Sequence, residues 1–325
     1  MDKRLWWVFG FGAFYGLMMR IVFGFLSPKL YSASDAASGP MLFSFIVLVP
    51  AVIGAITVYQ APRRTLRLCI FGPWAPLFLC TLGSALVLLE GSICIVMAFP
   101  IICVVGSVSG LITFAILHFI QPSKGTVRSI TLLPLILGGA ESFLTLPAEY
   151  ADSVSSVHID APPEIVWEFI VNPKDIEPDE LGDGLAYKIG TPYPEEAFTE
   201  LTDEGRIRHV RWAKGVTFDE VITDWEENRY VRWTYQFRPE SFPPGALDDH
   251  VVIGGKYFDL IDTSYQLTPD EQGTTLTLRV KYRVSTNFNW YSGPLSKLLV
   301  DDTAKTLLNF YKARSEDAQA HIAMN

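Results

Sequence analysis

The stretch "SVSSVHIDAPPEIVWEFIVNP", Ser153 to Pro173, decides which fold the second half of the chain adopts. Its first part alternates apolar and polar residues and stops at Pro162, which is typical of a strand with one buried face. Pro162 and Pro163 then begin a helix, where a missing backbone N–H does no harm because the first helical N–H groups lack partners. The sequence therefore predicts a strand followed at once by a short helix. Its apolar face at helical spacing consists of Ile165, Val166, Phe169 and Ile170.

Charge divides the chain near residue 150. Residues 1–150 carry a net charge of +4 and residues 151–325 one of −13, which together give the −9 of the chain. Long apolar runs fill the first part, so we expect a transmembrane domain at 1–150 and a separate domain at 151–325. The acidic part should repel phosphates, which excludes nucleic acid as a partner. All four cysteines lie in the first part, so the second part has no disulfide and needs its own core.

The first part contains apolar runs long enough to cross about 30 Å of hydrocarbon, which takes roughly 20 helical residues. A further run is shorter, is interrupted by Pro134 and contains Glu141. We therefore expect an all-α transmembrane bundle of 4–5 helices, with the lipid bilayer as its partner. The predicted spans are residues 5–26, 41–60, 68–89, 92–120 and, for the shorter run, 130–147.

Basic residues are unevenly distributed between these runs. Seven lysines and arginines lie before the first run, between the second and third, and after the fourth, whereas the other two connections contain only Lys29. The positive-inside rule therefore predicts a cytoplasmic N-terminus. Glu141 would be unfavourable in hydrocarbon without a partner, and Arg20 is the only other strong charge inside a predicted span, at a similar depth. We expect an intramembrane Arg20–Glu141 ion pair and a fifth crossing that delivers the second domain outside the cytoplasm. If the run folds back instead, that domain is cytoplasmic.

After the opening strand and helix, the second domain is predicted to contain a series of strands and one long amphipathic helix. The strands are expected at 206–213, 217–225, 230–237, 259–267 and 275–284, with a weaker one at 185–190. The helix is expected at 294–318. Its apolar stripe consists of Leu295, Leu298, Leu299, Leu307, Leu308 and Tyr311.

Three phrases in this order carry a family resemblance: "IDAPPEIVWEFI" (Ile159–Ile170), "GVTFDEVITDWEENRYVRWTY" (Gly215–Tyr235) and "GTTLTLRVKYRV" (Gly273–Val284). With the order β-αα-β6-α, residues 153–316 resemble the START-like (SRPBCC) superfamily, which includes polyketide cyclase/dehydrase-like proteins. The resemblance implies an α+β helix-grip fold, in which a curved antiparallel sheet wraps the C-terminal helix around a deep apolar cavity. The spans ahead of this domain are similar to those of bacterial membrane-anchored members, which implies a multi-pass protein of the bacterial inner membrane.

Alternation along the strands predicts which side chains face the interior of this domain. On the strand predicted at 217–225, one face carries Phe218, Glu220 and Ile222, which places the Glu220 carboxylate among apolar neighbours. It is either a proton acceptor with a raised pKa or a structural ion-pair partner of Arg208 or Arg232. The same inward faces are alternatively plain core. The residues expected to bind a ligand are Phe218, Glu220, Trp233, Tyr235, Tyr265, Leu278, Tyr282 and Trp290.

The leading functional hypothesis is membrane-tethered binding of a hydrophobic small molecule or lipid, because aromatic inner faces with few polar groups are typical of small-molecule sites. The alternatives are a cyclase- or hydrolase-type enzyme that uses Glu220, and a protein-interaction module whose cavity is filled by side chains. No metal and no cofactor are expected, since the histidines lack metal-ligand spacing and no nucleotide-binding glycine pattern occurs. The turn-rich segment 238–257 is a candidate lid over the cavity.

Overall fold

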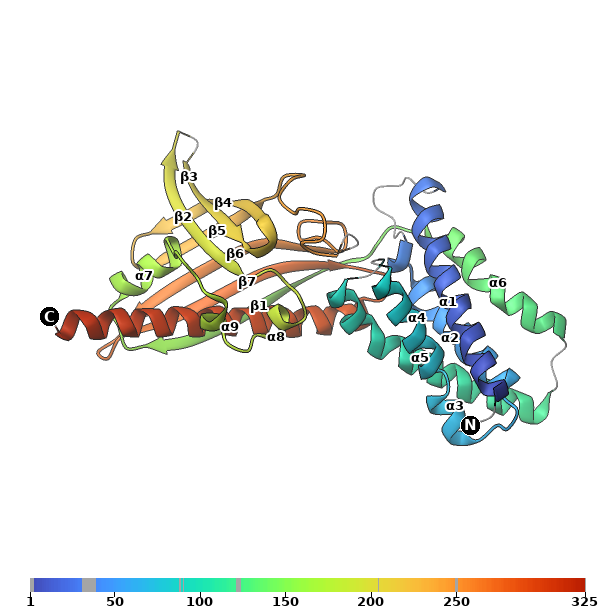
Figure 1. Cartoon of the computed structure of the whole chain (residues 1–325). Helices are drawn as coiled ribbons and strands as arrows, with labels where there is room; N and C mark the ends of the chain where they lie inside the picture. Colours follow the sequence, from blue (N-terminus) through green and yellow to red (C-terminus); the bar gives the residue numbers. More distant parts are fainter. Residues whose placement is uncertain are drawn as a thin grey trace. The chain divides into compact units, whose positions relative to one another are not determined.

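The computed structural model describes residues 3–30, 39–87, 89, 91–120, 124–203, 205–248 and 251–324. Leu88 of the third predicted span, and Asp249 and His250 of the candidate lid, lie outside these residues. The chain forms two compact units (Figure 1). The helical unit contains residues Met1–Pro147 together with Thr286–Phe288, and the sheet unit contains Ala148–Ser285 together with Asn289–Asn325.

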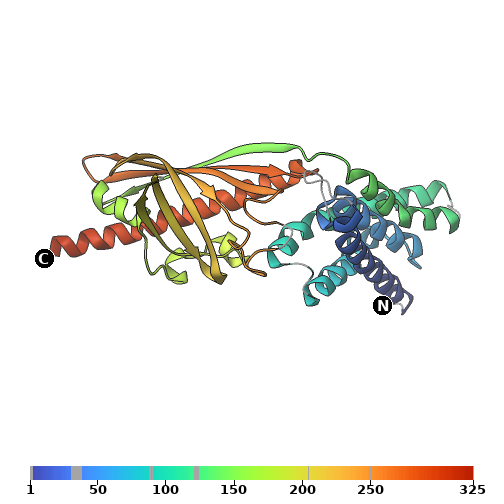
Figure 2. The ribbon, with the colours of Figure 1, turned by 90° about the horizontal axis from the view of Figure 1, so that it is seen from above.

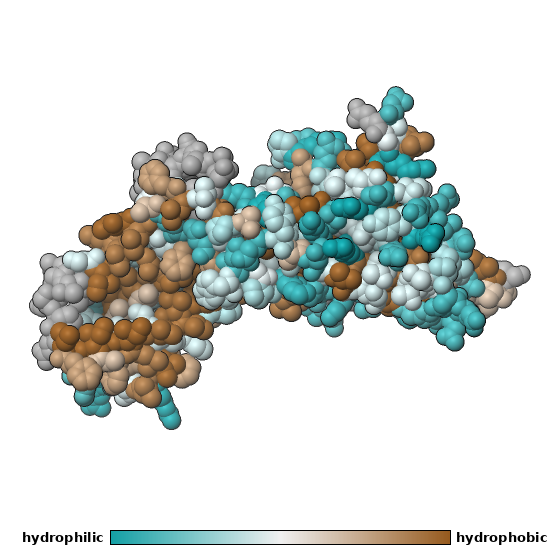
Figure 3. Space-filling view, turned by 180° about the vertical axis from the view of Figure 1, so that it is seen from behind, coloured by the Kyte–Doolittle hydropathy of each residue, from teal (hydrophilic) through white to brown (hydrophobic). Residues whose placement is uncertain are grey.

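Among its described residues, the helical unit has three helices that are long and apolar enough to cross a membrane: Lys3–Gly24, Leu66–Leu86 and Ser92–Phe119. Two apolar helices are shorter, Ser44–Gln60 and Ser129–Glu141. Apolar residues cover much of the face of this unit that is visible in Figure 3. Its α-helices are α1 (Lys3–Leu30), α2 (Val49–Gln60), α3 (Leu66–Phe71), α4 (Trp74–Leu86), α5 (Ser92–Phe119) and α6 (Lys124–Glu141). Before α2 lie a 3-10 turn, η1 (Gly39–Met41), and a π-helical turn, η2 (Ser44–Leu48).

Helix α6 lies six residues nearer the N-terminus than the span predicted at 130–147, although it has the same length of 18 residues. Glu141 is therefore the last residue of the helix, whereas the prediction placed it in the interior of a span. Its carboxylate accepts hydrogen bonds from the backbone N–H groups of Phe43 (2.6 Å) and Ser44 (2.8 Å), where η2 begins. The Ser44 hydroxyl and the Asn287 amide also donate to it. A carboxylate at the N-terminus of a helix is stabilised by exposed N–H groups and the helix dipole.

The expected Arg20–Glu141 ion pair is therefore not found among the described residues. Arg20 instead donates to the carbonyl oxygen of Leu89 at 2.5 Å. The prediction placed both charges at one depth because it put Glu141 six residues inside a span. Because the helix ends at Glu141, backbone N–H groups donate hydrogen bonds to the carboxylate, and it needs no cation as a partner.

The sheet unit is a seven-stranded antiparallel sheet with the order β1-β7-β6-β5-β4-β3-β2. Helix α9 (Asn289–Met324) runs along it, beside β1 and β7 (Figures 1 and 2). Two short helices, α7 (Pro163–Val171) and α8 (Leu185–Lys188), precede β2. The strands are β1 (Ala148–Ile159), β2 (Pro194–Thr202), β3 (Gly205–Trp212), β4 (Val216–Glu226), β5 (Tyr230–Gln236), β6 (Phe258–Pro269) and β7 (Thr274–Ser285).

One predicted strand is wrong and one strand was missed. In residues 185–190, where a weak strand was predicted, α8 (Leu185–Lys188) is followed by a turn, and β2 forms instead at Pro194–Thr202. β2 lies at the edge of the sheet and contains three glutamates, a composition that strand propensities disfavour but that protects an exposed edge. The segment after α7 also covers this edge. The Ala197 N–H donates to the Pro173 carbonyl at 2.8 Å, and the Thr199 N–H donates to the Asn172 side chain at 2.9 Å.

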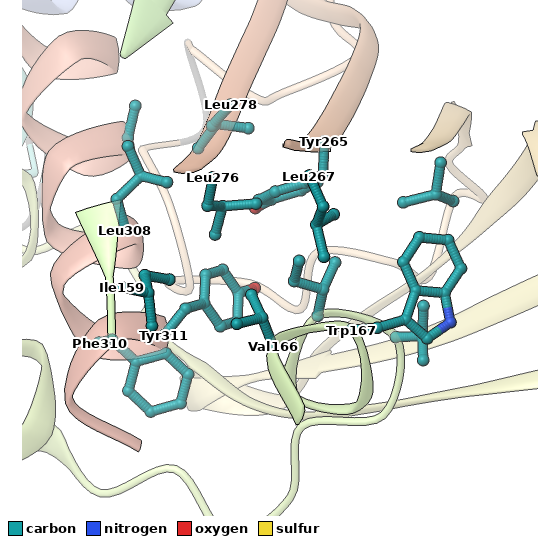
Figure 4. Packing of buried hydrophobic residues seen from close by; sticks show 14 of the residues in the cluster. Ile159, Val166, Trp167, Tyr265, Leu267, Leu276, Leu278, Leu308, Phe310 and Tyr311 are labelled. Carbon is teal, nitrogen blue, oxygen red and sulfur yellow. The ribbon is translucent and has the colours of Figure 1, made fainter. Parts of the chain in front are cut away.

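The main core of the sheet unit lies between the sheet, α7 and α9 (Figure 4). On β7 alternation predicts an inward face, of which Val280 is only half-buried and the other four residues are buried. The predicted face consists of Leu276, Leu278, Val280, Tyr282 and Val284. On α9 the predicted stripe holds for Leu308 and Tyr311 but fails at Leu298, which is exposed. The labelled members of the core in Figure 4 are Ile159, Val166, Trp167, Tyr265, Leu267, Leu276, Leu278, Leu308, Phe310 and Tyr311.

Candidate ligand site

A buried ion pair lies at the centre of the candidate site. Arg208 on β3 lies opposite Glu220 on β4 in the sheet. The exposed fraction of the residue surface is 6% for Arg208 and 4% for Glu220. The Arg208 guanidinium donates to the Glu220 carboxylate and, at 3.1 Å, to the carbonyl of Ile170 at the end of α7. Of the two partners considered for Glu220, the structure therefore selects Arg208. Arg232 forms its ion pair with Asp262, with 3.2 Å between Nη2 and Oδ2.

The surroundings of this pair are aromatic and dry. Burial raises the pKa of Glu220 above its ordinary value, and the Arg208 guanidinium opposes this shift. Burial likewise raises the pKa of the phenols of Tyr235, Tyr265 and Tyr311. These hydroxyls therefore stay neutral at physiological pH, and they can serve as hydrogen-bonding groups but not as bases.

Two buried donors in this cluster, Nε of Arg208 and the indole Nε1 of Trp233, have no partner at hydrogen-bond geometry among the described residues. The indole nevertheless lies close enough to the Glu220 carboxylate to lower its pKa, so Nε of Arg208 is the stronger candidate for an unsatisfied donor. The two side chains adjoin each other, since the guanidinium carbon of Arg208 lies 5.0 Å from the centroid of the Trp233 ring. Leaving a buried donor unsatisfied costs about 1–3 kcal/mol. An acceptor oxygen of a bound molecule would remove this penalty at both groups.

Most of the ligand-binding residues predicted from the sequence lie together around this pair. Tyr235 is the register partner of Glu220, and the Trp233 and Tyr265 rings lie 5.4 Å apart. Trp233, Tyr265 and Leu278 belong to the main core. Phe218 belongs to a second cluster with Val210, Val216 and Ala246, and Tyr235 packs against both clusters.

Two predicted residues lie apart from this group. Tyr282 is buried further along β7, where its ring lies 5.9 Å from that of Phe258. Trp290 lies in the first turn of α9 and is 66% exposed, so nothing in its packing connects it with the buried cluster.

Sequence reasoning missed two members of the site. Tyr311 was assigned only to the apolar stripe of the last helix, yet its ring lies 5.7 Å from that of Tyr265. Alternation along the strand predicted at 259–267 places Thr263 on the inward face, but Thr263 was not among the predicted ligand-binding residues. Its hydroxyl forms a hydrogen bond of 2.6 Å with that of Tyr235. Arg208 was predicted only as a possible ion-pair partner of Glu220, although its position in the strand also indicated a site residue. It occupies an inward position of β3, where an arginine needs a buried partner.

A separate cavity of about 200 Å³ opens where β2, β3, β4 and the turn after β5 meet. It is smaller than typical ligand pockets, which span roughly 300–1,000 Å³. His209 and Asp219 line it, and in each strand they alternate with Arg208 and Glu220. His209 lies between two carboxylates, with 2.7 Å from Nδ1 to Asp219 and 3.1 Å from Nε2 to Glu200. Arg238 also pairs with Asp219.

Comparison with known proteins gives one family match. Residues 151–316 match the family described as polyketide cyclase / dehydrase and lipid transport. No curated protein matches the chain. Similar solved structures include a START superfamily protein from Mycobacterium smegmatis, with 16% identity over 51% of this chain and 98% of that one, and a TM-score of 0.32.

Two further solved structures are similar. An uncharacterised protein from Rhizobium leguminosarum has 13% identity over 52% of this chain and 99% of that one, with a TM-score of 0.31. The di-domain ARO/CYC StfQ from the steffimycin biosynthetic pathway has 10% identity over 61% of this chain and 62% of that one, with a TM-score of 0.33.

Proposed function

Because the chain belongs, through residues 151–316, to the polyketide cyclase / dehydrase and lipid transport family, we propose that its sheet unit binds a hydrophobic small molecule or lipid. The apolar helices of the helical unit would hold this unit at a membrane. The ligand would be a lipid, an isoprenoid or a polyketide-like molecule with an acceptor oxygen among apolar atoms. Its apolar part would pack on Phe218, Trp233, Tyr235, Tyr265 and Leu278, and Tyr282 and Trp290 are the outlying candidates of the same set.

The unsatisfied donors beside the Arg208–Glu220 pair are the observation that supports this proposal most strongly. A side chain that served only to pack a core would be apolar, since buried ion pairs are often less stabilising than apolar residues of similar volume. This site instead retains a guanidinium, a carboxylate and an indole N–H, with one donor on Arg208 and one on Trp233 left without a partner among the described residues. An oxygen of the ligand would complete these hydrogen bonds.

Native mass spectrometry of the full chain tests this proposal. We expect a co-purified hydrophobic molecule in the wild type and at least a tenfold lower occupancy, about 1.4 kcal/mol, in the double variant Arg208→Met/Glu220→Leu. Removing both charges together keeps the domain folded, because neither is left buried alone. Arg211→Met is the matched control, since Arg211 lies on the same strand but is exposed. Equal occupancy in all three proteins would contradict the site. A wild type without any bound molecule would favour the protein-interaction module.

The raised pKa of Glu220 favours a second candidate, a cyclase- or hydrolase-type enzyme. A carboxyl group whose pKa is raised by burial can take up or release a proton near neutral pH. Glu220→Gln preserves the shape of the side chain but cannot accept a proton. An identified turnover that survived this substitution would eliminate Glu220 as the catalytic residue and leave the binding proposal intact.

We also propose how the chain is placed in the membrane. Residues 1–150 would form the transmembrane domain of a bacterial inner-membrane protein, and residues 151–325 the ligand-binding domain. The asymmetry of basic residues supports a cytoplasmic N-terminus. The apolar part of α6, Ser129–Glu141, is shorter than the three longer apolar helices. At 1.5 Å per residue it reaches about 20 Å, so a crossing would need the bilayer to thin around it. A fifth crossing by α6 would place the ligand-binding domain outside the cytoplasm.

A further inference from the structure

The first turns of α9 expose apolar side chains and bury polar ones. Trp290 and Leu298 are 66% and 52% exposed, whereas Ser292 and Ser296 are each only 8% exposed. Further along the same helix the pattern is the ordinary one, because Leu308 and Tyr311 are buried. A helix that packs on a sheet in water buries its apolar face. Within residues 289–311 of α9 the reversal therefore lies at 289–298, and apolar residues are exposed again near the end of the helix, at Ile322 and Met324.

The exposed residues of this segment form one continuous stripe. Trp290, Pro294 and Leu298 follow each other at intervals of four residues, which places them one above the other on the helix surface. Lys297 does not interrupt the stripe with a free charge, since its Nζ lies 2.8 Å from a carboxylate oxygen of Asp301 one turn later. Exposing such a stripe to water is unfavourable, so an apolar partner is expected to cover it.

The covalent chain places this stripe next to the helical unit. Residues Thr286–Phe288 belong to that unit, and Trp290 follows Phe288 by two residues, a path of no more than about 8 Å. The other connection is similar, because Pro147 belongs to the helical unit and Tyr150, three residues later, is 62% exposed. Each connection thus has an exposed aromatic residue beside the unit that contains the apolar helices. Tryptophan and tyrosine are enriched at the interface between bilayer and water.

We propose that the start of α9 lies in the interfacial layer of a phospholipid bilayer, with Trp290, Pro294 and Leu298 inserted at the boundary between headgroups and acyl chains. Helices of this kind bury their apolar face by roughly 5–10 Å. Tyr150 would occupy the same layer at the other connection. This inference rests on the proposed membrane insertion of the helical unit, and it adds a lipid-contacting surface on the sheet unit itself.

Spin labels at single cysteines of the full chain test this inference in vesicles of phosphatidylcholine and phosphatidylglycerol. The four native cysteines, all free thiols of the helical unit, are first replaced by alanine. One label is attached at Leu298→Cys and, as a second probe of the stripe, one at Pro294→Cys. Two matched controls use exposed positions: Val108→Cys in α5 reports whether the helical unit is inserted, and Ala313→Cys, roughly 22 Å further along α9, reports water.

Collision rates of each label with oxygen, which concentrates in lipid, and with a water-soluble nickel chelate give its depth. We expect the labels at 294 and 298 to collide mainly with oxygen, at a depth of roughly 5–10 Å, and the label at 313 to collide mainly with nickel. If label 108 reports lipid while labels 294 and 298 match label 313, the inference is wrong and the membrane proposal stands. If label 108 itself reports water, membrane insertion fails first. Labels 294 and 298 that are shielded from both reagents would show a protein partner or a second copy and would also overturn the inference.

Discussion

At the scale of the residue, β3 and β4 carry two charged networks on opposite faces of the sheet. Arg208 and Glu220 face the core, where burial leaves them dependent on each other, and His209 and Asp219 line the cavity of about 200 Å³. The inner network keeps one guanidinium N–H and one indole N–H without a hydrogen-bond partner among the described residues, and under the proposed function an acceptor oxygen of the ligand would bind there. In the outer network His209 and Arg238 both pair with carboxylates, so protonation of the imidazole can change stability with pH.

His209 should make the sheet unit more stable at mildly acidic pH. Burial disfavours its charged form, but hydrogen bonds to Asp219 and Glu200 outweigh this and raise the pKa of the imidazole. Since the folded-state pKa lies above the unfolded value of about 6.5, the contribution is complete below that pH and disappears as the pH rises through the folded-state pKa. We expect roughly 0.5–1 kcal/mol, a value typical of partly exposed pairs.

Thermal unfolding of the wild type and His209→Gln, measured at several pH values, checks this expectation. The difference in melting temperature should be largest near pH 6 and should shrink as the pH is raised towards 8. Asp219→Asn serves as the control, because it retains the imidazole but weakens the hydrogen bond that raises its pKa. A difference between the wild type and His209→Gln that stays constant with pH would mean that His209 gains no proton on folding.

At the scale of the element, the last helix combines two segments with different burial. Between Ala304 and Tyr311 the helix buries Ala304, Leu308, Phe310 and Tyr311 in the core, whereas Leu298 is exposed. We expect Leu308→Ala to destabilise the sheet unit by about 2–5 kcal/mol, since it removes a fully buried side chain and leaves a cavity. Ile322→Ala, on the exposed end of the same helix, should change stability by less than about 0.5 kcal/mol. Denaturant unfolding of the two variants would measure both values, and similar losses would show that the helix end packs in solution.

Strands with one buried face could be predicted from the sequence because alternation records burial directly. On β7 every second residue is apolar, and the predicted inward residues Leu276, Leu278 and Tyr282 are buried. The edge strand β2 could not be predicted in this way, because its three glutamates interrupt the alternation of apolar and polar residues that marks a buried face. Leu298 was misassigned because helical spacing identifies a stripe but not whether protein or another partner covers it. The position of Glu141 depended on backbone N–H groups of Phe43 and Ser44, nearly a hundred residues away in the chain.

At the scale of the whole molecule, α6 would decide on which side of the membrane the proposed ligand is bound. A helix that ends at Glu141 no longer has to hold a charge in hydrocarbon, because the carboxylate accepts its hydrogen bonds from η2 and Asn287. The main argument against a fifth crossing is thereby removed. Lys124 and Arg128, in the first turns of α6, favour a cytoplasmic start for this helix. We therefore predict that the sheet unit lies outside the cytoplasm.

Reporter enzymes fused to the C-terminus of the full chain measure this orientation in bacterial cells. Alkaline phosphatase, which is active only outside the cytoplasm, should be active in this fusion. Green fluorescent protein, which does not become fluorescent when it is exported in an unfolded state, should be dark. The same reporters inserted between α2 and α3, beside Arg63 and Arg64, should give the opposite result, because that connection carries the positive charge expected inside. A fluorescent C-terminal fusion without phosphatase activity would mean that α6 folds back. The ligand would then be bound on the cytoplasmic side, and the Arg208–Glu220 site and its proposed ligand class would remain unchanged.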